Sequence, residues 1–226
     1  MLSLSGENET HTLRPIAITT DLRGMKAFWD ARYAEEAYAY GTEPNGWFAQ
    51  QLATLPPGTM LLPAEGEGRN AVHAARMGWQ VTAFDISAQG REKAMRLAAR
   101  HGVHITYHVG ALHEIGPLAT GFDAIGFSFA HFPSAVRASL TTAIMQHLRP
   151  GGAVVFEAFA KEQLKYQPVH GSGGPQEAAM LYTIEEANAE FAGVDFHVLE
   201  EVEVQLNEGS YHQGLAKVVR GSGVKR

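Results

Sequence analysis

The segment from Leu61 to Asn70 reads as a buried strand that runs into a glycine turn and then into a helix. Gly66 and Gly68 have no Cβ, so a ligand can approach the backbone of the turn closely. The helix that begins near Arg69 directs its free amide groups to the same place. Asp85 ends the next hydrophobic stretch, where a carboxylate can accept hydrogen bonds from both ribose hydroxyls. This pattern predicts an α/β sheet that binds a nucleoside-containing ligand.

Strand-like and helix-like stretches alternate along the middle of the chain. The pattern predicts strands near 59–64, 79–85, 103–109, 122–129 and 151–159, with helices near 68–77, 87–101 and 133–148 between them. Such alternation requires a mostly parallel sheet. Two later strand-like runs, 196–206 and 210–220, are separated by Asn207-Glu208-Gly209, which predicts an antiparallel hairpin at the edge of the sheet.

The N-terminal part of the chain differs from this alternating region. Residues 1–24 are polar and without a sustained period, which predicts a mobile extension or a strap over the ligand. Residues 26–36 and a stretch ending at Leu55 have helical patterns around a turn at 40–45, so residues 25–58 are expected to form a helical lid. Residues 59–220 then form the single ligand-binding domain.

Composition narrows the function classes. The 226 residues contain no cysteine, which excludes disulfides, thiolate metal sites and cysteine nucleophiles. The net charge of −6 and the lack of a dense Lys/Arg cluster favour a small-molecule partner over nucleic acid. Because the sequence has neither an apolar run of about 20 residues nor a signal pattern, we expect a cytoplasmic protein without a membrane association.

The glycine turn alone leaves two enzyme classes open. Gly66-x-Gly68-x-x-Ala71 also fits the dinucleotide fingerprint of nicotinamide-dependent dehydrogenases, although no second βαβ half with a substrate domain accompanies it. Further segments resemble the class I methyltransferases that use S-adenosylmethionine, most closely the small bacterial group that includes the tellurite-resistance protein TehB. These segments are Trp29-x-x-Arg32-Tyr33, Tyr40-Gly41-x-x-Pro44-Asn45, Pro63 to Asn70, Phe84-Asp85-Ile86-Ser87 and Glu208-Gly209-x-x-His212-x-Gly214.

The resemblance implies a Rossmann-like fold with a mixed seven-stranded sheet and an antiparallel C-terminal hairpin. It also implies that the cofactor contacts the glycine turn, the ends of the second, third and fourth strands, and the lid. The residues at the matching positions are Tyr33, Tyr40, Asn45, Glu65, Gly66, Gly68, Asn70, Asp85, Ile86, Gly110, Ala111, Leu112, Ser128 and Phe129.

The chain departs from the family pattern at three places. Many members have an acid where Leu62 stands, a first glycine where Ala64 stands, and an aspartate near Gly110 or Ala111. We expect Glu65, at the strand end, to replace the first acid by reaching the ammonium group of the cofactor. The two glycines and Asp85 could also have purely structural roles. The glycines could permit close packing of a helix on a strand, and Asp85 could cap the N-terminus of the following helix.

Methyl transfer to a neutral acceptor benefits from a base near pH 7, and histidine is suited to it. His212 is the first candidate, because the resemblance places a pocket histidine there, and His131, after the fourth strand, is the second. His212 could instead be a structural residue of the hairpin. The family enzyme has an arginine where Gln213 stands, which disfavours tellurite as the acceptor. His104 and His108 would share a strand face, but without matching acids no metal site is expected.

The sequence therefore predicts methyl transfer from S-adenosylmethionine to a small nucleophile such as a thiol, a chalcogen oxyanion or a small metabolite, with S-adenosylhomocysteine as product. Two alternatives remain at this point. One is a protein that binds the cofactor without transferring a methyl group, and the other is the nicotinamide-dependent oxidoreductase. The loop at 171–175 is expected beside the acceptor cavity, where it could gate access.

Overall fold

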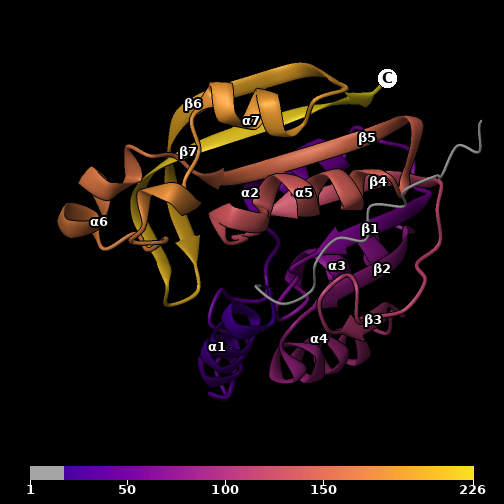
Figure 1. Ribbon diagram of the computed structural model, residues 1–226. Coiled ribbons are helices and arrows are strands. Elements are labelled where there is room, and N and C mark those ends of the chain that lie inside the picture. Colours follow the sequence, from indigo (N-terminus) through magenta and orange to yellow (C-terminus); the bar gives the residue numbers. More distant parts are fainter. Residues whose placement is uncertain (1–17) are drawn as a thin grey trace, which may run out of the picture.

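The computed structural model describes residues 18–226, and its centre is a seven-stranded sheet in the order β3-β2-β1-β4-β5-β7-β6 (Figure 1). The first five strands are parallel to one another, and β7 pairs antiparallel with both β5 and β6. The mixed sheet and the antiparallel C-terminal hairpin predicted from the sequence are thereby confirmed. The strands are β1 (Thr59–Pro63), β2 (Gln80–Asp85), β3 (Thr106–Val109), β4 (Phe122–Ser128), β5 (Leu148–Phe159), β6 (Val194–Glu208) and β7 (His212–Lys225).

Helices cover both faces of the sheet. The helices of one face are α2 (Gly46–Leu52), α3 (Arg69–Arg76) and α4 (Ala88–Arg100). Those of the other face are α5 (Ser134–Met145) and α7 (Ile184–Glu190). Each face therefore has its own apolar core, as expected where βαβ crossovers cover a parallel sheet on both sides.

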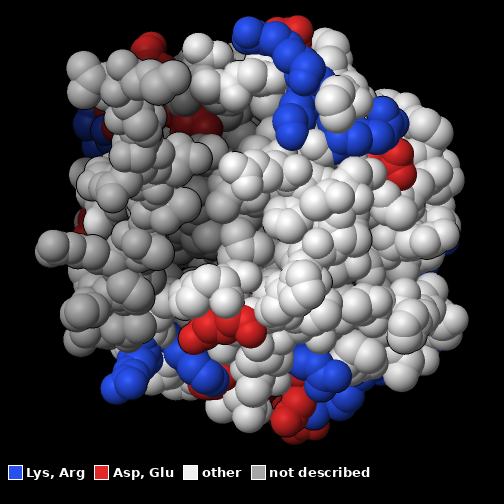
Figure 2. Space-filling view, turned by 45° about the vertical axis from the view of Figure 1, so that its right-hand side comes forward, with Lys and Arg blue, Asp and Glu red and all other residues white. Residues whose placement is uncertain are grey.

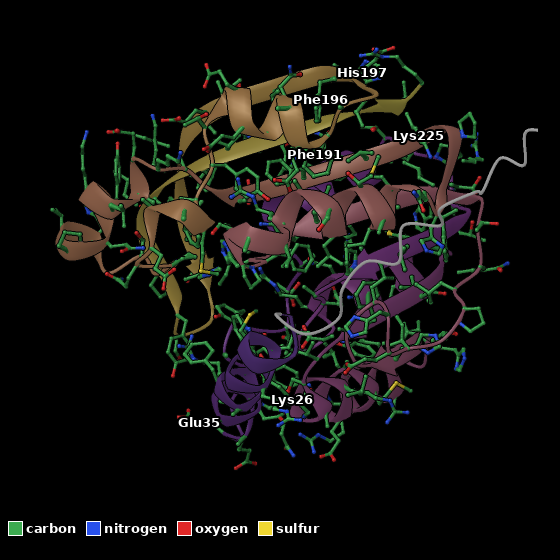
Figure 3. The ribbon with its side chains drawn as sticks, in the orientation of Figure 1. Lys26, Glu35, Phe191, Phe196, His197 and Lys225 are labelled. Carbon is green, nitrogen blue, oxygen red and sulfur yellow. The ribbon has the colours of Figure 1, made fainter. Side chains whose placement is uncertain are left out.

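Aromatic side chains fill the core beneath α7. Phe191 lies between α7 and the sheet (Figure 3), with its ring centroid 5.2 Å from that of Phe127 and 5.0 Å from that of Phe156. Burial of such rings contributes about 1.5–3 kcal/mol each. Nearby, Lys225 donates hydrogen bonds to the carbonyls of Met145 and Leu148, which fixes the end of β7 against the C-terminus of α5. The C-terminal end of β7 is thus fixed to α5 and to the start of β5.

The N-terminal helix begins earlier than the sequence pattern suggested. Helix α1 runs over Ile18–Tyr33, whereas the predicted span was 26–36. Residues 18–24 of the expected extension therefore belong to a helix, while residues 1–17 lie outside the described residues. The division into a mobile extension, a lid and a binding domain stays a prediction. In Figure 1 helix α1 lies below the hairpin of β6 and β7, beside α4.

The remaining helical segments lie between β5 and β6. Helix α6 (Gln163–His170) packs beside β7, and a short 3-10 helix, η1 (Ala178–Met180), precedes α7. The carboxyl ends of β1, β2 and β4 meet at one edge of the sheet, next to the tip of the β6–β7 hairpin and to α1. This edge is where a doubly wound sheet binds its ligands. Within residues 18–226, no helix has the length and apolarity to cross a membrane.

Candidate functional site

A pocket with about 1050 Å³ of empty space, including open solvent at its mouth, lies at the carboxyl edge of the sheet. Its walls come from α1, the glycine turn, the ends of β2, β3 and β4, the start of α5 and the hairpin tip. Most residues predicted for the site from the sequence line this pocket: Tyr33, Tyr40, Glu65, Gly66, Asn70, Asp85, Ile86, Gly110, Ala111, Leu112, Ser128, Phe129, His131 and His212. Segments far apart in the sequence are thus brought together in one cavity.

Asn45 and Gly68 are the two predicted residues that do not line the pocket. The side chain of Asn45 accepts a hydrogen bond from the Phe48 amide and donates to Glu157 and Glu208, so it caps α2 and joins the lid to the sheet. A Cβ on Gly68 would lie 2.4 Å from the Cβ of Ala94. Gly68 therefore permits the close packing of α3 against α4, which is the structural reading that the sequence left open.

The glycine turn brings the lid onto the sheet. Gly66 has a φ of +59°, and a Cβ there would lie 2.6 Å from the hydroxyl oxygen of Tyr33. Ala64, which occupies the position where the family has its first glycine, adopts a φ of 50°. Left-handed backbone costs a residue with a Cβ about 1–2 kcal/mol. The chain keeps the backbone conformation of a glycine at Ala64 without having the glycine.

Asp85 connects the end of β2 to the glycine turn. One carboxylate oxygen accepts from the Gly66 amide at 3.0 Å and the other from the Ser87 amide at 2.8 Å. Burial raises the pKa of Asp85 to about 6, although the two amide hydrogen bonds oppose this shift. The N-cap of α4 is Ser87, whose hydroxyl accepts from the Gly90 amide at 3.0 Å, so capping is not the role of Asp85.

Glu65 lies in the turn between β1 and α3, and its side chain reaches the first turn of α3. One of its carboxylate oxygens accepts a hydrogen bond from the Ala71 amide at 2.7 Å. Burial raises the pKa of Glu65 to about 7, while amide groups and the charge of Arg69 act in the opposite direction. A positive group in the pocket would favour the ionised form further. The expected contact between Glu65 and a cofactor ammonium group stays a prediction, with Glu65 placed on the pocket wall to make it.

His212 begins β7 and is only 5% exposed. Its Nδ1 lies 3.3 Å from a carboxylate oxygen of Glu208, and the same oxygen accepts a hydrogen bond from Arg69 at 2.7 Å. The rings of Tyr40 and Phe129 pack on the imidazole, with centroids 4.5 Å and 4.6 Å from it. Burial lowers the pKa of His212 below 6.5, although the hydrogen bond with Glu208 raises it.

The pKa of Glu208 is lowered to about 2. Burial alone would raise it, but the hydrogen bond from His212 and the charge of Arg69 outweigh burial. Glu208 is therefore a carboxylate at neutral pH. Since a carboxylate can only accept hydrogen bonds, it fixes the proton of a neutral His212 on Nδ1 and leaves the lone pair on Nε2.

His131 follows β4 and lines the same pocket. Its ring is nearly parallel to that of Phe159, with centroids 5.7 Å apart. Both of its ring nitrogens are buried without a hydrogen bond of normal geometry in the described protein, although the Met180 backbone is close enough to raise the pKa of the ring. Burial lowers the pKa of His131 to about 3, and the nearby His212 adds to this shift. His131 is therefore an uncharged imidazole at neutral pH.

Sequence reasoning missed the charged residues that hold the site together. Glu67 forms a buried ion pair with Lys93 at 2.7 Å, and Arg69 pairs with Glu208. Glu208 was within a quoted segment, four residues before His212, and this spacing across a tight hairpin could have indicated the pair. No comparable signal marks Lys93, because its partner lies 26 positions away.

The expectation that His104 and His108 share a strand face is wrong, because β3 begins at Thr106 and leaves His104 outside it. In the described part of the chain, no group of three histidine or acidic side chains could hold a metal ion.

The pocket residues fit S-adenosylmethionine. Its charged wall residues are Glu65, Glu67, Asp85 and Arg69, an acidic majority that suits a ligand with an ammonium and a sulfonium group. Apolar groups at the ends of β2 and β3 suit an adenine ring, with Ile86 and Leu112 on the wall. Asp85, at the end of β2, lies on the same wall.

Comparison with known proteins finds similarity to methyltransferases. Residues 63–152 match the family described as "Methyltransferase domain". A protein-L-isoaspartate O-methyltransferase of Methylorubrum extorquens (strain PA1) is 29% identical over 157 residues, which cover 63% of this chain and 66% of that protein. The chain thus spans just under two thirds of the length of this relative.

Solved structures share the fold at low sequence identity. One, from work on the conversion of a disulfide bond into a thioacetal group during echinomycin biosynthesis, aligns with a TM-score of 0.73 at 18% identity and covers 89% of this chain and 91% of its own. TehB from Haemophilus influenzae aligns with a TM-score of 0.65 at 14% identity, covering 89% of this chain and 67% of its own.

These findings decide between the two enzyme classes that the glycine turn had left open. The matched segment contains the glycine turn, Asp85 and the whole of β4, and its family is one of methyltransferases, not dehydrogenases. The sheet order, with its antiparallel C-terminal pair, is that of the class I fold. Residues 63–152 thus match a methyltransferase domain within a class I fold, and S-adenosylmethionine is the cofactor that this match indicates.

Proposed function

We propose that this protein transfers the methyl group of S-adenosylmethionine to a small-molecule nucleophile, with His212 as the general base. The observation that carries the proposal is the Glu208–His212 pair on the wall of the pocket that also contains Asp85 and the glycine turn. The cofactor supplies a methyl group on a positively charged sulfur, which an acceptor displaces while the sulfur keeps the electron pair. The protein supplies position and a proton acceptor.

The base acts through Nε2 of His212. Because Glu208 keeps the Nδ1 proton in place, Nε2 can take the proton of an S–H, O–H or N–H acceptor. A pKa below 6.5 keeps the imidazole neutral and ready to accept at pH 7. Glu208 acts through His212 and is a positioning residue. Such a base contributes typically about 10²–10⁴-fold to the rate.

The remaining pocket residues hold and orient the reactants. We propose that Asp85 accepts hydrogen bonds from the ribose, Glu65 receives the ammonium group, and Gly110, Ala111 and Leu112 line the adenine. Tyr33 and Tyr40, from the lid, line the same pocket as Ser128 and Phe129. Exclusion of water and alignment of donor and acceptor by such walls contribute on the order of 7–11 kcal/mol to the barrier reduction.

A small acceptor suits the site better than a macromolecule. Aromatic rings of α1 and of the following loop line the pocket. The rings of Trp29 and Tyr33 stack with their centroids 5.4 Å apart, and the ring centroid of Tyr40 lies 6.4 Å from that of Trp29. On the face shown in Figure 2, Lys and Arg side chains stand in small groups beside Asp and Glu at its margins and form no continuous basic surface. We therefore propose a small-molecule acceptor, although the relative from Methylorubrum is named for a protein substrate.

The proposal is tested by offering acceptors and measuring S-adenosylhomocysteine. The panel contains thiols, small amines, selenite, tellurite and halides. With an accepted thiol or amine, His212→Asn should lower kcat at least about 100-fold while the Kd of S-adenosylmethionine stays within twofold. His197→Asn is the matched control, since His197 is exposed on β6 (Figure 3). Tight cofactor binding without product from any acceptor would contradict the proposal and support a protein that only binds the cofactor.

A further inference from the structure

We infer that the end of the pocket around His131 binds the methyl acceptor, and that this acceptor is an uncharged organic molecule with one weakly acidic S–H or O–H group. The inference rests on the proposed function, because it concerns the acceptor of that reaction. It goes further by naming the residue that binds the acceptor and the charge that the acceptor must have.

The first observation is the hydrogen-bonding capacity of His131. Both ring nitrogens are buried, and neither forms a hydrogen bond of normal geometry in the described protein, although the Met180 backbone is close enough to raise the pKa of the imidazole. A neutral imidazole offers one donor and one acceptor. Buried polar groups are normally paired, so an unpaired imidazole on a pocket wall is suited to a ligand that both accepts and donates a hydrogen bond. A hydroxyl or thiol group has both capacities.

The second observation is the apolar surroundings of this imidazole. The ring of Phe159, which is fully buried, lies parallel to it, and the ring of Phe129 lies 6.3 Å away between centroids. Phe129 and Phe159 also contact His212, with centroids 4.6 Å and 5.2 Å from that ring. His131 and His212 therefore flank the same pair of phenyl rings, so an acceptor bound at His131 lies beside the proposed base. Apolar walls favour the uncharged body of an organic acceptor.

The third observation is the charge of the pocket. The wall residues with a positive charge are limited, in the described residues, to Arg69, which is paired with Glu208 at 2.7 Å. Arg137, near His131, is paired with Glu190 at 2.7 Å. An anionic acceptor would thus lose its hydration without gaining a free cation, and it would face Glu65 and Asp85. His131 is neutral at pH 7, because burial lowers its pKa to about 3, so it adds no positive charge to the pocket.

The test compares two thiols of the same shape, benzyl mercaptan and 4-(mercaptomethyl)benzoate, which differ by one carboxylate. Alkyl thiols stay largely protonated at pH 7. Binding is measured by calorimetry on protein saturated with S-adenosylhomocysteine, which cannot react, and turnover is measured with S-adenosylmethionine. We expect benzyl mercaptan to bind at least about 10-fold more tightly than the carboxylate and to have the higher kcat/KM.

Variants of His131 locate the binding. His131→Leu should weaken benzyl mercaptan at least about 10-fold, because it removes both ring nitrogens. His131→Gln, which keeps a donor and an acceptor, should recover part of this loss. In both variants the Kd of S-adenosylhomocysteine should stay within threefold, which shows that the fold is intact. His197→Leu is the control for loss of a histidine away from the pocket.

The outcomes separate the inference from the proposed function. Binding of benzyl mercaptan through His131 without turnover of any acceptor would uphold the binding site for an uncharged molecule at His131 and contradict the proposed function. Turnover of tellurite, selenite or the carboxylate thiol in preference to benzyl mercaptan would uphold methyl transfer and overturn the inference of an uncharged acceptor. Equal binding of the two thiols, binding of neither, or benzyl mercaptan binding that is unchanged in His131→Leu would overturn the inference.

Discussion

Ala64 combines a side chain and a backbone conformation that disfavour each other. Its φ of 50° lies in the left-handed region, at the turn between β1 and α3. Ala64→Gly should raise the free energy of unfolding by about 0.5–1 kcal/mol, since relief of the strain exceeds the entropy gained by the unfolded chain. Urea denaturation measures the change.

The same substitution at Ala138 provides the control. Ala138 is exposed in the middle of α5, where glycine should lower the free energy of unfolding by about 1 kcal/mol. A decrease in stability for Ala64→Gly similar to that for Ala138→Gly would show that the turn does not carry the strain.

Glu208 fixes the tautomer of His212 and raises its pKa against the effect of burial. Glu208→Gln should lower kcat about 10-fold or more, because an amide can donate as well as accept and no longer fixes the proton on Nδ1. In the wild type, kcat should rise with pH with a midpoint below pH 6.5, since the base must be neutral and burial lowers its pKa. Without the negative charge of Glu208, which raises this pKa, the acid limb should move to lower pH.

The profile is measured at saturating cofactor and acceptor, so that the titrations of Asp85 and Glu65 affect it least. An acid limb that stays in place in Glu208→Gln, or moves to higher pH, would contradict the proposed action of Glu208 on His212. His197→Asn again serves as the variant with an unchanged profile.

At the scale of elements, the loop at 171–175 supports the hairpin tip. Gln163, fully buried at the start of α6, donates to the Ser172 hydroxyl at 2.8 Å and to the Gly173 carbonyl at 2.9 Å. A Cβ on Gly173 would lie 2.1 Å from the Tyr211 carbonyl oxygen and 3.2 Å from Cδ2 of His212. The loop lies beside the proposed base, as expected, but its contacts are those of a packed support. Gating by this segment stays a prediction.

These contacts predict the effect of a methyl group at Gly173. Gly173→Ala should displace His212 and lower kcat at least about 10-fold, with the Kd of S-adenosylmethionine unchanged. Gly171→Ala is the matched control, because Gly171 also has a positive φ but its Cβ would meet nothing within 4 Å. Stopped assays of S-adenosylhomocysteine measure kcat. Equal losses in the two variants would attribute the effect to backbone strain alone.

Sequence patterns predicted the elements well where the pattern is regular. The strands at 59–63, 80–85 and 122–128 and the terminal hairpin lie within a few residues of the predicted spans. Helix α1 was displaced by several residues, because its N-terminal half is too polar to show a period. The alternating region is defined by burial on both faces of the sheet, whereas α1 packs through one side and leaves Phe28 exposed.

At the scale of the whole molecule, the sequence predicted which segments meet but not how their charges pair. The glycine turn and Asp85 were identified from strand ends, because the carboxyl ends of parallel strands share an edge, whereas His212 was identified from the family resemblance. The pairs Arg69–Glu208 and Lys93–Glu67 join segments 139 and 26 positions apart, and such pairing follows from tertiary packing alone. They fix the hairpin tip and α4 to the glycine turn, so the pocket walls depend on contacts across the entire domain.

The central claim is that this pocket binds S-adenosylmethionine through Asp85, and calorimetric titration of the cofactor tests it most directly. We predict that Asp85→Asn weakens binding at least about 10-fold, because charge-assisted hydrogen bonds to the ribose are lost. Asp195→Asn, at an exposed aspartate of β6, should bind as the wild type does. A Kd for Asp85→Asn within twofold of the wild type, in a variant with an unchanged unfolding midpoint, would contradict the claim.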